Sequence, residues 1–182
     1  MSIRHRLSGL CRRIGGAIRA YSPSLLLALA ATRGLAADPV LTVVLPGKSI
    51  AFTSDEMGGF PHTEISAFDP HEKKELRYSG VPVHDLLSRA GVQFGEKLRG
   101  PSLRLAVILH AKDGYATLFA LAEFADEFSD RTLLLADGED GKPLPPGLGP
   151  FRLIAPGDKR AARWARMVTS IEVVQFPQEP AH

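Results

Sequence analysis

The sequence predicts an α+β domain with a strand-rich, mixed-sheet core and few, short helices. Three observations lead to this fold class: short apolar runs with β-branched residues recur, turn residues separate them, and a single segment shows clear helical spacing. The predicted strands are 41–45, 62–68, 74–78, 103–110, 115–119, 132–136, 151–155 and 167–176. No repeat of fixed period occurs, and the main loop is the Pro/Gly-rich stretch 143–150.

The first strand, 41–45, is a β-branched run that ends at Pro46-Gly47. The segment Thr53-Ser54-Asp55-Glu56 has the composition of a helix start, and Gly58-Gly59 predicts that this helix is short. The extended segments 62–68 and 74–78 can then pair across a polar turn. The chain therefore begins with strands and one brief helix.

The clearest helix follows residue 82. Its apolar residues recur at the i, i+3, i+4, i+7 spacing of a buried helical face: Val83, Leu86, Leu87 and Ala90. Pro82 suits the first turn, and Gly91 suits the end of the helix.

Turn signals divide the second half of the chain. Lys112-Asp113-Gly114 predicts a hairpin between the strands 103–110 and 115–119. Residues 121–128 are expected to form a short helix, and 137–141 a turn after the strand 132–136. The strands 151–155 and 167–176 complete the domain, and the end of the chain from residue 177 to 182 is expected to be a flexible tail.

Residues 1–37 have the features of an export signal. Six arginines and no acid occur there, a short apolar run begins at Ser24, and small residues precede Asp38. The apolar run is far shorter than the roughly 20 residues that span a bilayer. We expect a periplasmic protein whose mature domain covers 38–176. An uncleaved amphipathic anchor is the alternative, and the Arg12-Arg13 pair leaves the twin-arginine and general export routes both open.

The single cysteine of the chain, Cys11, lies in this leader. The mature domain therefore has no disulfide and no thiolate ligand for a metal. Its histidines show neither the H-x-H nor the H-E-x-x-H spacing of zinc sites, so no metal site is predicted.

A basic segment stands out against the rest of the mature chain. Formal net charge is +2 overall, but without the six leader arginines 16 basic residues face 20 acidic ones. Within 149–166, one acid, Asp158, accompanies five cations: Arg152, Lys159, Arg160, Arg163 and Arg166. Such a local cluster predicts a site for a small anion, because arginine binds oxyanions through paired N–H groups. The acidic remainder would repel nucleic acid.

Five short motifs, in order, carry a resemblance to a known family. They are Tyr78 to Leu87 (YSGVPVHDLL), Lys112 to Tyr115 (KDGY), Leu134 to Asp137 with Gly141 to Leu144 (LLAD, GKPL), Gly149 to Pro156 (GPFRLIAP) and Arg163-Trp164. Together they resemble the sulfite oxidase-type molybdopterin-binding domain, in the small exported form found in bacteria. The resemblance covers 40–175 and implies a mixed α+β fold with a distorted, barrel-like β core that holds a molybdenum cofactor.

The resemblance also implies roles for residues. Arg152 corresponds to the arginine that reaches the cofactor, and Arg163 to the basic residue beside the family's tryptophan. Lys159 and Arg160 are candidates for the rim of the site. Asp113 and Tyr115 match an Asp-Gly-Tyr motif, in which Asp113 organises the turn and Tyr115 packs inward.

One departure limits what the resemblance implies. Family enzymes bind molybdenum through a protein thiolate, and the corresponding region of this chain, 61–78, contains no cysteine. Its polar residues are expected to belong to an ordinary strand. They are His62, Thr63, Glu64, Ser66, Asp69 and His71.

Three functions are therefore compatible with the sequence. The first is a binding module for a pterin or another small anion that has lost the cysteine ligand. The second is an active molybdenum-dependent oxidoreductase with a different ligand and a redox or membrane partner protein. The third is a non-catalytic protein-interaction scaffold. The fold alone does not choose among them, because function depends on the site.

Overall fold

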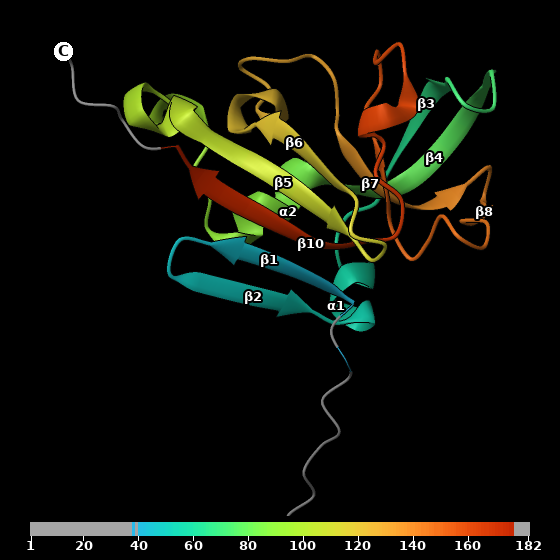
Figure 1. The fold of residues 1–182 in the computed structure, drawn as a ribbon, viewed down its shortest axis with the longest axis horizontal. Coiled ribbons are helices and arrows are strands. Elements are labelled where there is room, and N and C mark those ends of the chain that lie inside the picture. Colours follow the sequence, from blue (N-terminus) through green and yellow to red (C-terminus); the bar gives the residue numbers. More distant parts are fainter. Residues whose placement is uncertain (1–37, 39, 177–182) are drawn as a thin grey trace, which may run out of the picture. The chain divides into compact units, whose positions relative to one another are not determined.

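Two five-stranded sheets form the framework of the computed structural model, which describes residues 38 and 40–176 (Figure 1). The first sheet has the order β2-β1-β10-β5-β6. Its strands are β1 (Leu41–Leu45), β2 (Lys48–Phe52), β5 (Leu105–Ala111), β6 (Ala116–Ala120) and β10 (Val168–Gln175). All neighbours are antiparallel except β1 and β10, which run parallel with Thr42 opposite Ser170.

The second sheet is antiparallel and centres on β7. Its strands are β3 (Thr63–Asp69), β4 (Lys74–Pro82), β7 (Leu134–Glu139), β8 (Lys142–Pro143) and β9 (Arg152–Ile154). Strand β4 pairs with one side of β7, and β8 and β9 pair with successive parts of its other side. The predicted strand-rich α+β class is confirmed.

The described residues contain two α-helices and four short 3₁₀ segments. The helices are α1 (Ser54–Gly58) and α2 (Val83–Ala90), and the 3₁₀ segments are Gly95–Lys97, Gly100–Arg104, Leu121–Phe124 and Ala161–Arg163. Helix α1 starts where the sequence predicts: the Thr53 side chain accepts from the Glu56 amide, and Glu56 accepts from the Thr53 amide at 2.8 Å. None of the described helices is both long and apolar enough to cross a membrane.

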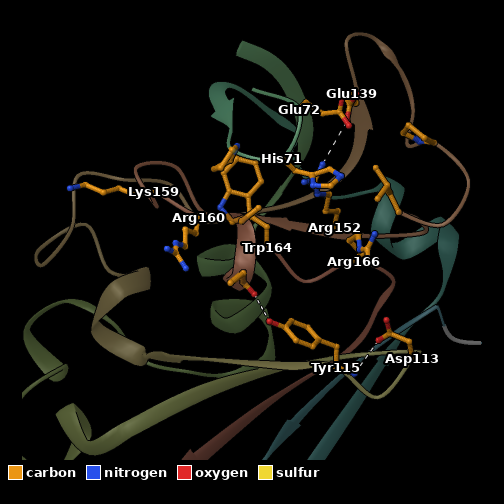
Figure 2. A pocket seen from close by; sticks show the side chains of 15 residues that line it. His71, Glu72, Asp113, Tyr115, Glu139, Arg152, Lys159, Arg160, Trp164 and Arg166 are labelled. Atoms are coloured by element: carbon orange, nitrogen blue, oxygen red, sulfur yellow. Dashed lines mark hydrogen bonds and ion pairs between the residues drawn. The ribbon is translucent and has the colours of Figure 1, made fainter. Parts of the chain in front are cut away.

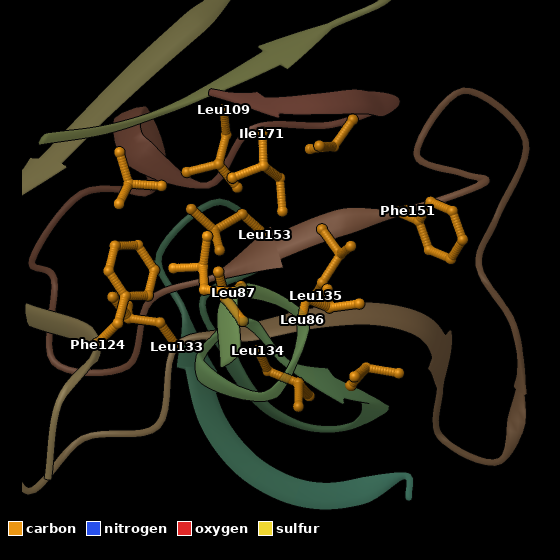
Figure 3. Packing of buried hydrophobic residues seen from close by; sticks show 14 of the residues in the cluster. Leu86, Leu87, Leu109, Phe124, Leu133, Leu134, Leu135, Phe151, Leu153 and Ile171 are labelled. Atoms are coloured by element: carbon orange, nitrogen blue, oxygen red, sulfur yellow. The ribbon is translucent and has the colours of Figure 1, made fainter. Parts of the chain in front are cut away.

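Helix α2 carries the predicted apolar face into the core. Val83, Leu86, Leu87 and Ala90 are all fully buried, and Gly91 ends the helix in the left-handed conformation at φ 106°. Figure 3 shows Leu86 and Leu87 between side chains of both sheets. Leu109 and Ile171 come from the first sheet, and Leu134, Leu135 and Leu153 from the second. The core therefore lies where α2 and the two sheets meet.

Several elements differ from expectation, and three of the differences bear on the prediction of secondary structure. The segment 121–128 was expected to be helical, but it forms one 3₁₀ turn, Leu121–Phe124, and leaves Phe128 53% exposed. Residues 137–139, expected in a turn, extend β7 instead, and the turn begins at Asp140. Strand β2 was not predicted, because Lys48, Ser49 and Ala51 are exposed on a sheet edge and give it no apolar pattern. The predicted leader 1–37 and tail 177–182 lie outside the described residues.

Gly80 allows β4 and β7 to approach closely. The pairing register of the two strands shifts between Ser79 and Gly80, and a Cβ atom on Gly80 would lie 2.2 Å from the backbone oxygen of Leu135. That separation is well inside van der Waals contact with an atom that cannot rotate away. Glycine is required here by packing, and the shift lets the strand continue toward α2.

Candidate functional site

A cavity of about 720 Å³ lies beside the loop between β9 and β10. Its walls come from the β3–β4 turn, the β5–β6 turn, the end of β7, the stretch 145–152 and the segment 159–166 (Figure 2). This volume is within the range of roughly 300–1,000 Å³ that small-molecule sites occupy. Five of the six predicted site residues line it: Asp113, Tyr115, Arg152, Lys159 and Arg160. Arg163 does not.

Arg152 forms the inner wall and is almost inaccessible, with 5% of its side chain exposed. Strand β9 places it within the second sheet, where its NH2 group donates to Asp69 Oδ2 at 2.9 Å and its NH1 group to the Tyr78 hydroxyl at 3.4 Å. The guanidinium carbon lies 5.7 Å from the ring centre of Tyr78 and 5.3 Å from that of Trp164. A buried acid and two aromatic rings therefore already compensate this charge.

Asp69, at the end of β3, is the acid that neutralises Arg152. Its Oδ1 accepts from the backbone amides of His71 at 2.7 Å and Glu72 at 3.1 Å, and its Oδ2 accepts from Tyr78 at 2.8 Å and from Arg152. Burial raises the pKa of Asp69, but these hydrogen bonds and the Arg152 charge outweigh burial, so the pKa is lowered. Burial and the bond to Asp69 raise the pKa of Tyr78 far above its ordinary value.

Three cations on the segment 159–166 face the cavity and are exposed: Lys159, Arg160 and Arg166. No carboxylate within the described residues forms an ion pair with any of them. They differ in this from Arg152, so the free positive charge of the cavity lies on this segment and not on β9.

Arg163 does not face the cavity but forms hydrogen bonds that hold the loop carrying Lys159 and Arg160. Its Nε and NH2 groups donate to the two carboxylate oxygens of Asp158 at 2.9 and 2.7 Å, and its NH1 group donates to Glu123 at 3.2 Å. Arg131 contacts the same two acids, at 2.9 Å from Asp158 Oδ1. The guanidinium of Arg163 also lies 4.4 Å from the ring centre of Phe119.

This charge network attaches the 156–163 loop to the 3₁₀ segment Leu121–Phe124. Burial alone would raise the pKa of Asp158, but the bonds from Arg163 and Arg131 outweigh it and lower the pKa. Glu123, in that 3₁₀ segment, forms ion pairs with both Arg131 and Arg163.

The Asp-Gly-Tyr turn closes another side of the cavity. Asp113 Oδ1 accepts from the Tyr115 amide at 3.0 Å, which is the local turn contact expected from sequence. Tyr115 was expected to pack inward, but it is 48% exposed, because its hydroxyl reaches across the cavity wall to donate to the Ala162 carbonyl at 2.6 Å. Tyr115 thereby connects the β5–β6 turn to the cationic segment.

Sequence reasoning missed two acids of the cavity, Glu72 and Glu139. Glu72 lies in the β3–β4 turn, and Glu139 ends β7 with 17% of its side chain exposed and 3.9 Å from Arg152 NH1. Burial raises the pKa of Glu139, more than the charges of Arg152 and Lys74 lower it. Their one sequence signal is an acid in a predicted turn, between the strands 62–68 and 74–78 for Glu72 and within 137–141 for Glu139.

The region expected to replace the family's cysteine, 61–78, offers little to a metal. Of the six polar residues named for this region from the sequence, His71 alone lines the cavity, while His62 is bonded to Asp137 at 2.8 Å and Asp69 already accepts four hydrogen bonds. The residues that the structure describes include no group of three or more His, Cys, Asp or Glu placed to hold a metal ion. The side chains present suit an anionic group, and they provide no thiolate.

The two sheets, the helix α2 and the charged cavity define a strand-rich α+β domain of the sulfite oxidase type. The chain belongs to the family of oxidoreductase molybdopterin binding domains, whose family model matches residues 48–181.

Among solved structures, the sulfane dehydrogenase SoxCD from Paracoccus pantotrophus is similar, with a TM-score of 0.57 and 22% sequence identity. That match covers 73% of this chain and 37% of the SoxCD chain, so this chain spans little more than a third of it. No curated protein matches the chain. At this identity the likeness supports the fold alone.

Proposed function

We propose that this chain is an exported member of the family that binds a pterin or another small anion in the cavity, without a cysteine ligand for molybdenum. The observation that carries the proposal is the set of three exposed, unpaired cations, Lys159, Arg160 and Arg166, that face a cavity of about 720 Å³. Free cations beside a concave site attract anions from solution.

Each part of the cavity has a role in this proposal. Lys159 supplies a mobile point charge, while Arg160 and Arg166 offer the planar forks that suit phosphate or carboxylate oxygens. The Asp158–Arg163 contact holds their loop in place, which reduces the entropy lost when a ligand binds. A molybdenum cofactor, when bound, supplies redox chemistry at its metal, and its phosphate suits the same cations.

The available side chains argue against ordinary molybdenum ligation. The chain has one cysteine, Cys11, and it lies in the predicted leader. Asp69, a carboxylate at the expected position, already accepts hydrogen bonds from four donors, so coordination would leave buried donors without acceptors. An anion-binding module therefore agrees better with these residues than an oxidoreductase with an oxygen ligand.

A binding assay tests this proposal directly. Trp164 is the only tryptophan of the chain and lines the cavity, so its fluorescence should be quenched when pterin-6-carboxylate binds. The triple variant Lys159→Ala/Arg160→Ala/Arg166→Ala should lose most of this affinity. The matched control Lys97→Ala/Arg99→Ala/Arg104→Ala removes three cations outside the cavity and should retain it.

The molybdenum and pterin content of the native protein distinguishes the binding module from the oxidoreductase and the interaction scaffold. The full chain would be produced in a cofactor-competent bacterium and examined by elemental analysis for molybdenum and by fluorescence of released pterin. Stoichiometric molybdenum would favour an active oxidoreductase with a non-cysteine ligand and a redox or membrane partner. Absence of metal, of pterin and of any binding of pterin-6-carboxylate would favour a protein-interaction scaffold.

Export is proposed from the features of residues 1–37. Cell fractionation should find the protein in the periplasm, and mass spectrometry should show a mature N-terminus near Asp38. A full-length protein that stays with the membrane would instead indicate an uncleaved anchor.

A further inference from the structure

The first sheet has one covered face and one open face. Val43, Leu109 and Ile171 point to the covered face and are fully buried in the core that α2 and the second sheet share. Successive side chains of a strand alternate between the two faces, so the neighbours of these residues point away from the core. Figure 1 shows α2 behind β5 and β10, so the open side of the sheet, called the outer face below, lies toward the viewer.

Large apolar side chains line the outer face. They are Val44 on β1, Ile108 on β5, Leu118 on β6, Val174 on β10 and Phe176 directly after it. The pairing of β1, β10, β5 and β6 places the first three in one row across the sheet. Leu118 is 49% exposed and Phe176 is 51% exposed, so this surface is open within the part of the chain that the structure describes. Connected apolar surface of this kind marks contact sites.

The strands of the first sheet are poor in charge, unlike those of the second. Strands β1 and β6 contain no charged residue, and β2 contributes Lys48, which points to the covered side and donates to the Ala90 carbonyl at 3.3 Å. Every strand of the second sheet contains at least one charged residue. A sheet face that stays in water normally carries polar side chains. The composition of the outer face therefore favours a contact surface over a solvated one.

One polar pair lies within this apolar surface. His110 comes from β5 and Glu172 from β10, and the Glu172 carboxylate accepts from the His110 ring at 3.0 Å. The two side chains are 40% and 39% exposed, so both can also be reached from outside. A donor beside an acceptor is complementary to the same pair turned by 180°, so the outer face matches a second copy of itself. A partner of another kind would have to present an acid and a base at the same spacing.

The area of the outer face is sufficient for a weak dimer. Five strands about 4.8 Å apart, with five to eight residues in each, give it an extent of roughly 24 Å by 20 Å, or about 500 Å². Two such faces together would bury about 1,000 Å², near the lower limit of specific interfaces. We therefore expect a dimer that dissociates readily, with a Kd on the order of 10 µM.

We propose that two copies of this chain associate through their outer faces, about a twofold axis that brings His110 of each copy to Glu172 of the other. The apolar side chains around this pair supply the buried contact area. No residue of the outer face lines the cavity, so the dimer leaves the cavity of each copy open. The dimer is therefore independent of the proposed function.

Sedimentation velocity tests the dimer on the chain as it is isolated from the producing bacterium. Over roughly 1–500 µM, a range that brackets the expected Kd, the wild type should shift from monomer to dimer. Leu118→Glu should weaken the dimer at least about tenfold, because a symmetric interface would then bury two unpaired charges. Phe68→Glu is the matched control: it makes the same kind of change on the edge strand β3, where Phe68 is 53% exposed, and should leave the dimer intact.

Charge variants of the polar pair test the twofold arrangement. His110→Glu gives each outer face two acids, and Glu172→Lys leaves it with bases alone. Each variant by itself should dimerise at least about tenfold more weakly than the wild type, because like charges meet across the axis. An equimolar mixture of the two should form a heterodimer with nearly the wild-type affinity. Circular dichroism melting curves would verify that both variants are folded.

Three results would overturn the dimer. The first is a wild type that stays monomeric up to about 500 µM, which would leave the outer face to a different protein. The second is a dimer that Leu118→Glu does not weaken, and the third is a mixture of charge variants that fails to associate. Binding of pterin-6-carboxylate, followed by Trp164 quenching, should be equal in the wild type and in Leu118→Glu, so a failure of the dimer and a failure of the proposed function are observed separately.

Discussion

Replacement of Asp69 by asparagine should destabilise the domain by about 3–5 kcal/mol, the usual cost of removing one partner from a buried ion pair. Asp69 Oδ1 accepts two backbone amides, and its Oδ2 accepts from Tyr78 and Arg152. An asparagine has a single oxygen, so one of these two pairs of donors must face an NH₂ group. The substitution therefore removes both the negative charge that faces Arg152 and one of the two oxygen acceptors.

The expected change is large enough to measure by urea unfolding followed through Trp164, whose ring lies 6.0 Å from that of Tyr78. At roughly 2–4 °C per kcal/mol for a chain of this size, the melting temperature should fall by about 10 °C. Asp126→Asn, at an exposed position, should change stability by less than about 0.5 kcal/mol.

A double variant and a pH series test the contribution of the Asp69–Arg152 pair to stability. Asp69→Asn/Arg152→Met also removes the cation that the single change leaves unpaired, while the asparagine oxygen can still accept from the backbone amides of His71 and Glu72, so it should recover part of the lost stability. The folded-state pKa of Asp69 is lowered, so its contribution is present above the ordinary aspartate pKa of about 4 and is lost as pH falls through the folded value. Two results would contradict the description of Asp69 and Arg152 as a mutually neutralising pair. One is a loss of less than about 1 kcal/mol in the free energy of unfolding of Asp69→Asn, and the other is a double variant that is no more stable than the single variant.

Three further changes have expected outcomes. Asp158→Asn should release the loop that carries the cavity cations and weaken pterin-6-carboxylate several-fold, and an unchanged affinity with a lower Tm would make Asp158 purely structural. Gly80→Ala should destabilise the domain by about 3 kcal/mol or more through its clash with Leu135, as measured by urea unfolding; full stability would mean that the strands can separate at little cost. The hydrogen bond to Asp137 raises the pKa of His62. As pH rises past about 6.5, the free energy of unfolding of the wild type should therefore fall by at most about 1 kcal/mol relative to that of His62→Gln. A relative increase would contradict that assignment.

Local patterns predicted most of the elements. The spacing of apolar residues predicted α2, and the buried face of that helix is the one expected. Strand β2 escaped prediction because an edge strand exposed to solvent needs no apolar alternation. The segment 121–128 was expected to be a short helix but forms a single 3₁₀ turn, since local composition alone does not determine how far a helix extends.

The cations of the site were found from composition, but their partners were not. Arg152 meets Asp69, which is 83 positions away in the sequence, and Arg163 meets Glu123, which is 40 positions away. No local pattern encodes pairs of that kind, because tertiary packing brings them together. As a result, the two arginines expected to bind the anion are paired internally, and the free charges are those of Lys159, Arg160 and Arg166.

The parallel pairing of β1 with β10 has a consequence for how the chain acquires its structure. The first sheet needs β10 between β1 and β5, so it cannot be completed until residue 175 is available. A chain that emerges N-terminus first therefore lacks the central strand of this sheet until nearly all of it has been made. Contacts of such long sequence separation slow folding. A protein that crosses a membrane as an extended chain would stay without a completed first sheet for most of its synthesis, and β10 would complete that sheet last.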